Sequence, residues 1–299
     1  EDKLNKCQLN EDYYKIIIDY SIPDPVSGST DWTEVRNFNL MFKTFVGPVE
    51  DESGIVYLRP ESAQGIFVNF KNVMDTARLK PPFGIAQIGK AFRNEINTKN
   101  FLFRTREFEQ MEMQYFIKPG TEQEWFDYWK EQRWNWYLKM GLKPERLKWK
   151  VHEKLAHYAN NAVDIEYEFP FGFGEIEGIH SRTNFDLTNH QTHSGKKMEY
   201  VDTVNQDRYI PYVVETSGGV SRTFMAFLCN AYDEEKIIDE GKEETHVVLR
   251  FNPNLAPITL AVFPLVNKDG MPEFAHKIYK DMQKYFRVQY DTSGAIGRR

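Results

Sequence analysis

The stretch RNEINTKNFLFRTREFEQMEMQYF, residues 93–116, is the part of the chain that most constrains its fold. Apolar and polar side chains alternate over residues 86–95, and again over residues 110–116. Because successive side chains of a strand point to opposite faces, both runs are predicted to be strands with one apolar and one polar face. A long, polar and basic loop joins them. A hairpin with Arg and Glu on its polar face, next to such a loop, indicates a floor for an anionic ligand.

Outward from this hairpin, the pattern predicts helices on both sides. Residues 60–74 are predicted to be a helix, with Pro60 at its entry and Ser62 as its cap. Residues 121–140 carry a broad stripe of Trp, Phe and Tyr at helical spacing, which we expect to pack in the core. Strands are predicted at 162–169 and 209–215, and the second runs into a buried helix at 217–232.

The pattern changes after about residue 250. The linker FNPNLAP contains two prolines and is typical of a domain boundary. An apolar strand (258–266), an amphipathic helix (271–286) and a second strand (287–291) follow, which is the order of a βαβ unit. We therefore expect one domain over residues 1–250 and a second that opens at residues 255–299.

Composition excludes few functions. The net charge of −6 argues weakly against a surface coated with nucleic-acid-binding charge, but it leaves room for a local basic surface. No apolar stretch approaches membrane-spanning length, so we expect no membrane partner. Cys7 and Cys229 are isolated and form neither a disulfide framework nor a metal-binding spacing. The simplest location for such a chain is a reducing cytoplasm.

Four groups of residues have the chemistry of a site. They are Arg93 with Glu95; Arg104, Arg106 and Phe108; the acidic residues Glu61, Glu112, Glu175 and Glu215; and the turn ETSGGVSR at 215–222. Guanidinium groups bind phosphate in a bidentate way and stack on flat rings, and a phenyl ring can cover a purine. Small residues at a strand-to-helix turn let backbone approach a ligand. Together they predict an ATP site with neither a P-loop nor a dinucleotide fingerprint.

Each of these residues also has a simpler explanation. A single Arg or Glu is usually a solvated side chain, which for Arg104 and Arg106 alone is the better interpretation. Glu112 between two methionines is more often the exposed face of a half-buried strand, and Ser217 with two glycines can be a plain helix cap. The histidines, among them His157, His180, His190 and His193, match no metal motif, so structural or surface roles are expected.

Several motifs resemble one enzyme family. Residues 93–116 resemble the second signature motif of class II aminoacyl-tRNA synthetases, and ETSGGVSRTFMAFL (215–228) resembles the third. Four more segments are similar to glycyl-tRNA synthetases of the homodimeric type: FNLMFKTFVGP, RPESAQGIFVNF, DIEYEFPFG and EGIHSRTNFDL, at residues 38–48, 59–70, 164–172 and 177–187. The resemblance implies an α+β fold, with a class II antiparallel sheet flanked by helices and then the start of an α/β anticodon-binding domain.

The resemblance implies where ATP binds. Arg93 matches the motif-two arginine, which holds the α-phosphate and the amino-acid carboxylate, and Arg222 matches the motif-three arginine over adenine; these are the expected catalytic residues. Phe108 matches the ring under adenine. Glu175 and Glu215 are the expected ligands of the Mg²⁺ that accompanies ATP, with glycine binding as the alternative role of Glu215. The full expected ATP set is Arg93, Asn94, Glu95, Phe103, Arg104, Arg106, Phe108, Glu175, Ile176, Gly219 and Arg222.

The resemblance also implies how glycine is selected. Glycine offers an ammonium, a carboxylate and two hydrogens, so a site must grip the ammonium and leave no room at the α-carbon. Acidic groups that match Glu61, Glu112 and Glu215 do this in the family, with Ser217 closing the pocket. The full expected glycine set is Glu61, Phe108, Glu109, Gln110, Met111, Glu112, Glu215, Ser217 and Gly219.

The implied activity is that of a glycine–tRNA ligase, with glycine, ATP and tRNA(Gly) as partners and a homodimer in the full-length protein. The first class II motif is not found, so the chain is expected to be a fragment with an incomplete core. PDPVSGST (23–30) lies where the family often carries a cysteine-bearing insert, so zinc is not expected. Two alternatives stay open: a non-catalytic, synthetase-like accessory or regulatory protein, and a synthetase for another small amino acid or a related amide-forming ligase.

Overall fold

The computed structural model describes residue 4, residue 7 and residues 9–153, 155–156, 159–202, 204–239 and 242–294. It divides into two compact units. The first consists of Glu1–Pro60 and Phe92–Asn97, and the second of Glu61–Ala91 and Thr98–Arg299.

The first unit contains little regular structure. Helix α1 spans Asn10–Asp19, and strands β1 (Lys43–Phe45) and β2 (Ile55–Tyr57) pair antiparallel around the short helix η2, Glu52–Gly54. The segment from Phe92 to Asn97 joins this unit through its backbone: the N–H of Phe92 donates to the Arg59 carbonyl and that of Asn94 donates to the Leu40 carbonyl.

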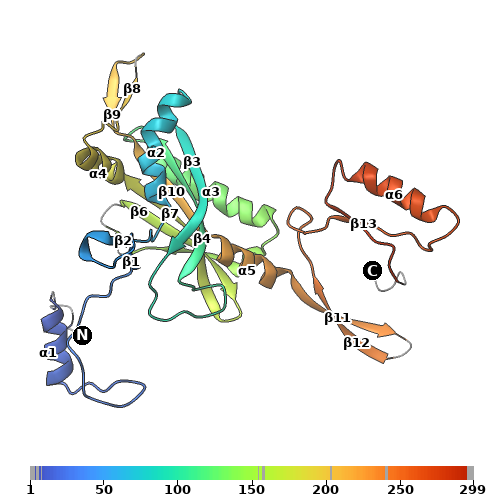
Figure 1. Cartoon of the computed structure of the whole chain (residues 1–299), viewed down its shortest axis with the longest axis horizontal. Helices are drawn as coiled ribbons and strands as arrows, with labels where there is room; N and C mark the ends of the chain where they lie inside the picture. Colours follow the sequence, from blue (N-terminus) through green and yellow to red (C-terminus); the bar gives the residue numbers. More distant parts are fainter. Residues whose placement is uncertain are drawn as a thin grey trace. The chain divides into compact units, whose positions relative to one another are not determined.

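A six-stranded sheet is the centre of the second unit (Figure 1). Its order is β3-β4-β10-β7-β6-β5, and the pairs from β4 to β5 are antiparallel. The strands span Phe83–Phe92 (β3), Glu107–Ile117 (β4), Leu147–Val151 (β5), Asn161–Phe169 (β6), Gly172–Thr183 (β7) and Tyr212–Gly219 (β10). Strands far apart in sequence are therefore neighbours, since β10 lies between β4 and β7.

Helices bury both faces of this sheet. Helices α2 (Ala63–Thr76) and α4 (Phe185–Ser194) share one core with Phe116 and Val213, and helices α3 (Glu122–Lys139) and α5 (Val220–Ala231) share another with Val214. Because Val213 and Val214 are consecutive in β10, their side chains point to opposite faces. The two cores thus lie on opposite sides of one sheet, and the aromatic stripe of α3 packs in the core as the sequence predicted.

The remaining elements are smaller. They are η3 (Pro144–Arg146), the hairpin β8 (Tyr200–Asp202) and β9 (Asp207–Tyr209), and the hairpin β11 (Tyr232–Asp239) and β12 (Lys242–Leu249). Strands β13 (Leu260–Val262) and β14 (Val288–Tyr290) pair in parallel with α6 (Met271–Met282) between them. The predicted βαβ order is confirmed; residues 295–299 of the expected second domain lie outside the described residues.

Several details differ from the sequence-based predictions. The strand predicted at residues 209–215 is β10, Tyr212–Gly219, so the helix predicted from residue 217 begins at Val220. Strand β3 ends at Phe92 rather than Glu95, because the next backbone N–H groups bond to Leu40 and Arg93 carbonyls instead of a neighbouring strand. Ser62 occupies the cap position of α2, but its hydroxyl makes no cap bond. The buried face of the hairpin is the polar one: Gln110, Glu112 and Gln114 are buried.

Candidate active site

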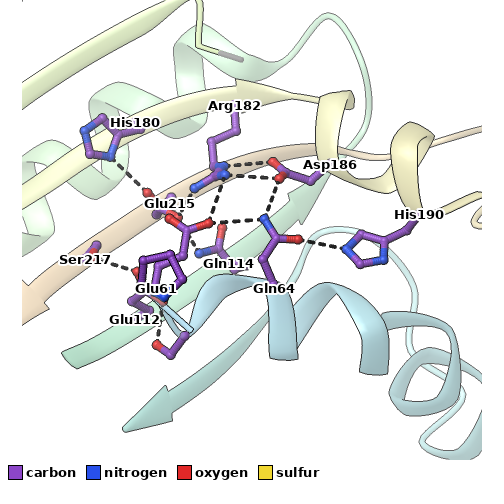
Figure 2. A network of polar contacts seen from close by, with 12 residues as sticks. Glu61, Gln64, Glu112, Gln114, His180, Arg182, Asp186, His190, Glu215 and Ser217 are labelled. Carbon is purple, nitrogen blue, oxygen red and sulfur yellow. Dashed lines mark hydrogen bonds and ion pairs between the residues drawn. The ribbon is translucent and has the colours of Figure 1, made fainter. Parts of the chain in front are cut away.

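Polar side chains of three neighbouring strands meet on one face of the sheet. Strand register places Gln114 opposite Glu215 and Glu112 opposite Ser217, and on the other side of β10 it places His180 opposite Glu215. Side chains that are opposite one another in antiparallel strands share a face, and neighbours two residues apart along a strand do too. Register alone therefore gathers these groups, as Figure 2 shows.

Glu215 is the most fully engaged of these carboxylates. Its Oε2 accepts from Arg182 Nη1 at 2.8 Å and from Gln114 Nε2 at 2.6 Å, and its Oε1 lies 3.0 Å from His180 Nδ1. Burial alone would raise the pKa of Glu215, but the charge of Arg182, followed by the hydrogen bond and charge of His180, lowers this pKa to about 2. Glu215 is therefore a fixed negative charge at any physiological pH.

Glu112 is equally buried, but its hydrogen-bond partners among the described residues are uncharged. Its carboxylate accepts from the hydroxyls of Ser62 at 2.5 Å and Ser217 at 2.9 Å. Burial, then repulsion from Glu215, raises the pKa of Glu112 to about 7, and the two hydroxyl donors offset this rise only in part. Glu112 thus changes its charge near neutral pH.

The Gln110 side chain contacts both serines whose hydroxyls donate to Glu112. Its Nε2 donates to Ser217 Oγ at 3.0 Å, and its Oε1 accepts from the backbone N–H of Ser62 at 3.3 Å. The Ser62 hydroxyl is therefore used inside the site rather than at the end of α2, which explains the absent helix cap. Strand β10 and the start of α2 are tied together through β4.

A second ring of contacts surrounds Arg182. Its guanidinium makes a bidentate pair with Asp186, at 2.8 and 3.1 Å, and lies 3.8 Å from Glu61 Oε1. Gln64 Nε2 bridges Glu61 and Asp186 at 3.1 and 3.0 Å, and Gln64 Oε1 lies 2.9 Å from His190 Nε2. Figure 2 shows Gln64 between Asp186 and His190. The whole arrangement is held by charge-assisted bonds, which are the stronger kind.

Negative charge exceeds positive charge here. Four carboxyl groups, those of Glu61, Glu112, Asp186 and Glu215, form what we name the carboxylate cluster; the positive groups bonded to it among the described residues are the Arg182 guanidinium and the His180 imidazole. Burial lowers the pKa of His180, but its bond and ion pair with Glu215 outweigh burial and raise this pKa. The cluster therefore favours a further, compact cation with several N–H donors.

Arg222 forms a separate group with Phe103 and Glu175. Its Nε donates to the Phe103 carbonyl at 2.9 Å, and its Nη1 donates to the Glu175 carbonyl at 3.1 Å and lies 3.4 Å from Glu175 Oε2. The guanidinium carbon lies 4.4 Å from the centroid of the Phe103 ring, which is stacking distance. A planar cation held flat in this way can bind a phosphate edge-on or an aromatic ring face-on.

The comparison with known families agrees with this architecture. Residues 46–231 match the family model described as the tRNA synthetase class II core domain (G, H, P, S and T). The chain belongs to this family. Residues 1–40 match a second model, described as glycyl-tRNA synthetase insertion domain 1. The class II fold expected from the sequence motifs is thereby confirmed.

Curated relatives of this class II chain share more than half of its residues. It is 59% identical over 271 residues to the glycine–tRNA ligase of Treponema denticola, which covers 89% of this chain and 60% of that protein. It is 57% identical over 291 residues to the glycine–tRNA ligase of Chlorobaculum tepidum, covering 97% of this chain and 61% of that protein. The chain thus spans about six tenths of the length of these relatives.

A solved class II structure has the same fold. Giardia lamblia prolyl-tRNA synthetase in complex with prolyl-adenylate superposes with a TM-score of 0.61 at 18% sequence identity, over 87% of this chain and 50% of that chain. At this identity, the likeness establishes the fold alone.

The structure brings only some of the expected class II site residues together. Glu61, Gln110, Glu112, Glu215 and Ser217 meet in the carboxylate cluster or at its edge. Phe103, Glu175 and Arg222 meet in the second group, and Gly219 lies against the Arg222 stem. Ile176 is buried and Met111 approaches Gly218, so both also serve packing. The exposed Arg106 and Glu109 and the half-buried Phe108 show no role by position alone.

Three expected ATP residues belong to the first unit. Arg93 Nε donates to the Pro60 carbonyl at 3.1 Å, Asn94 Nδ2 donates to the Asn39 carbonyl at 3.3 Å, and Glu95 follows in the same segment. In the second unit, Arg104 forms a backbone bridge with Lys99, and its Nε is buried without a hydrogen-bond partner among the described residues. A buried guanidinium nitrogen that lacks an acceptor is suited to receive an anion.

Sequence reasoning missed several residues of the carboxylate cluster's surroundings. They are Gln64, Gln114, His180, Arg182, Asp186 and His190. A signal existed: His180 and Arg182 are two apart in one strand, and Asp186 follows Arg182 closely, in the first turn of α4. The surface or structural role expected for His180 and His190 becomes a specific one in the cluster, whereas His157 lies outside the described residues.

Across the part of the chain that the structure describes, no three His, Cys, Asp or Glu side chains gather as metal ligands would. Nor does any helix in that part combine the length and the apolar character required to cross a bilayer.

Proposed function

We propose that this protein is a glycine–tRNA ligase, which activates glycine with ATP to glycyl-adenylate and transfers the glycyl group to tRNA(Gly). The observation that carries the proposal is the carboxylate cluster, in which Glu61, Glu112 and Glu215 lie close together and carry more negative charge than their cationic partners neutralise. The bonded side chains around them leave little space for a ligand side chain. The relatives named glycine–tRNA ligase support the proposal independently.

The carboxylate cluster suits an amino acid with no side chain. An ammonium has three N–H donors, and acceptors are offered by Glu61 before α2, Glu112 on β4 and Glu215 on β10. Ser217 and Gln110 fill the space beside them. A pocket that only fails to reward one extra methylene discriminates by ~1–3 kcal/mol, so steric exclusion by these side chains is the stronger device. Alanine and serine should therefore be rejected.

Glu215 serves glycine rather than Mg²⁺ in this proposal. Its Oε2 already accepts from Arg182 and Gln114, whereas its Oε1 is bonded, among the described residues, to His180 alone, so Oε1 keeps one lone pair for a single N–H donor of the glycine ammonium. Glu175 is exposed beside Arg222 and is the better ligand for the Mg²⁺ that arrives with ATP. Oxygen ligands on phosphates and one or two carboxylates are what Mg²⁺ prefers.

The chemistry proceeds without an enzyme nucleophile. An oxygen of the glycine carboxylate attacks the α-phosphorus, and pyrophosphate leaves; the terminal hydroxyl of tRNA then attacks the glycyl carbonyl, and AMP leaves. Arg93 neutralises charge at the α-phosphate, while Arg104 and Arg106 bind the terminal phosphates. Arg222 and Phe108 cover the adenine, and Asn94, Glu95, Ile176 and Gly219 complete the set of residues that bind ATP in this proposal. Such catalysis rests on positioning and charge stabilisation.

The proposal extends to organisation. Residues 1–250 act as the catalytic part and residues 255–299 open an anticodon-binding domain, in a protein that works as a homodimer in the cytoplasm. The order of the βαβ elements supports the second domain.

The test is exchange of labelled pyrophosphate into ATP by the full-length protein. We expect exchange with glycine, none with alanine or serine, and loss of exchange in Arg93→Ala. Glu112→Gln should weaken glycine binding far more than ATP binding. A protein that binds ATP but never supports glycine-dependent exchange would instead be the accessory or regulatory alternative, and exchange with another small amino acid would redirect the assignment.

A further inference from the structure

The Phe103 ring lies in a tight space formed by Phe169, Phe171, Gly174 and Arg222, which we call its seat. The centroid of this ring lies 5.3 Å from the Phe169 ring centroid and 5.1 Å from that of Phe171, and both pairs are packed edge to face. The guanidinium carbon of Arg222 lies 4.4 Å from the same centroid. Gly174 closes the seat: a Cβ built there would lie 2.6 Å from Phe103 Cζ and 2.7 Å from its Cε2. The ring therefore fits only because residue 174 has no side chain.

The loop between β3 and β4 is shaped to deliver this ring. Lys99 and Arg104 exchange both backbone hydrogen bonds at 3.2 Å, and Asn100 and Phe101 between them adopt left-handed conformations. The resulting tight turn leaves the Phe101 side chain 81% exposed while Phe103 points inward. Two residues of one type, two positions apart, thus have opposite environments.

The same residue also holds Arg222 through its backbone. The Phe103 carbonyl accepts from Arg222 Nε, and the Phe103 ring stacks on the guanidinium face. The Glu175 carbonyl accepts from Arg222 Nη1. A long, flexible side chain fixed at three points loses its conformational freedom before the ligand arrives, which lowers the entropic cost of binding. One face of the guanidinium is used by Phe103, so a second flat ring stacks on the other.

We infer that Phe103 is a positioning residue for ATP, which holds Arg222 flat for the adenine ring and depends on the missing side chain at Gly174. The inference rests on the proposed ATP-dependent function. Phe103 does not itself stack on the base, because its ring is already packed between Phe169, Phe171 and Arg222.

Gly174 supplies a test from a different strand. Its backbone is not left-handed, so alanine is conformationally allowed there, and the nearest obstacle is the far end of the Phe103 ring. Gly174→Ala should therefore push the ring out of its seat, with Arg222 losing its stacking partner, while β7 stays folded. In the Phe103→Ala background the same methyl meets no ring, so Gly174→Ala should then have no further effect.

The experiment measures ATP affinity of the full-length protein by calorimetry without glycine, and the KM values for ATP and glycine in pyrophosphate exchange. Gly174→Ala and Phe103→Ala should each raise the Kd and KM for ATP about tenfold, with the glycine KM changed less than twofold. The double variant should also be about tenfold weaker, not a hundredfold as additive effects require. Phe101→Ala, the matched control on the same loop, should bind ATP like the wild type.

The outcomes separate the two proposals. Additive losses in the double variant, or normal ATP affinity in Gly174→Ala, would overturn the role of Phe103. Wild-type protein that binds ATP without glycine-dependent exchange would instead overturn the proposed function and leave the Phe103 test valid. If Gly174→Ala does not fold, Phe103→Leu takes its place: it keeps an apolar side chain without a flat face, so ATP affinity should fall with an unchanged unfolding midpoint, and unchanged ATP affinity would refute the inference.

Discussion

Glycine binding should release a proton from Glu112. In the free site, the Glu112 carboxyl has a pKa near 7 because it is buried and lies beside Glu215. An ammonium placed against it favours the ionised form, so glycine binds the ionised state and lowers this pKa. The other groups that face this site are Glu61 before α2, Glu215 on β10, and His180 and Arg182 on β7.

The size of the effect follows from the pKa of about 7. Glu112 is ionised in about 90% of molecules at pH 8 but in only about 10% at pH 6, so glycine affinity should fall about tenfold, or ~1.4 kcal/mol. The number of protons released on binding should rise from ~0.1 at pH 8 to ~0.9 at pH 6. The ammonium of glycine stays protonated over this range.

Calorimetric titration of glycine in two buffers of different ionisation enthalpy measures both quantities. Glu112→Gln should abolish the proton release. His180→Gln keeps a donor for Glu215 but cannot titrate, so it should retain the release and separates Glu112 from the other group that titrates nearby. Equal affinity at pH 6 and pH 8, or binding without proton release in the wild type, would refute the reasoning.

Three further predictions concern the same face of the sheet. Glu112→Gln should stabilise the fold at pH 8. The folded-state pKa of Glu112 lies above the ordinary value of 4.5, so its ionisation lowers the free energy of unfolding by up to ~3 kcal/mol as pH rises from about 4.5 to 7. Urea unfolding should show the variant's gain in stability at pH 8 but not at pH 4, and an equal gain at both pH values would contradict this cause. Arg182→Met should lower the free energy of unfolding by ~3–5 kcal/mol, because the buried carboxylates of Asp186 and Glu215 lose their ion pair with the guanidinium. Adding Glu215→Gln to that variant should recover part of the loss, and no recovery would argue against the charge explanation. Gly178→Ala places a Cβ 2.6 Å from His180 Cε1, so the His180 ring should move away from Glu215. The KM for glycine should then rise several-fold while the KM for ATP stays unchanged. A rise in both KM values would indicate a wider distortion.

Much of the fold could be predicted because its signals are local. Alternation in residues 110–116 marks β4, the aromatic stripe at 121–140 marks α3, and the turn at 215–222 marks the junction of β10 and α5. Each signal depends on side-chain spacing within one element. The predicted end of β3 was wrong because the Asn94 backbone N–H bonds to the Leu40 carbonyl, an acceptor in a distant segment that local side-chain spacing does not reveal.

The candidate site divides in the same way. By itself, the sequence determined which charged side chains are available to a ligand, namely Glu61, Glu112, Glu215 and Arg222, and it predicted which positions share a strand face. Only the tertiary structure decided that the polar face of β4 is the buried one, that Arg182 and His180 neutralise Glu215 but not Glu112, and that Gly174 makes the seat of Phe103. The reason is physical: burial and charge pairing depend on distances between segments brought together by strand register, and residue order within one segment carries no record of those distances.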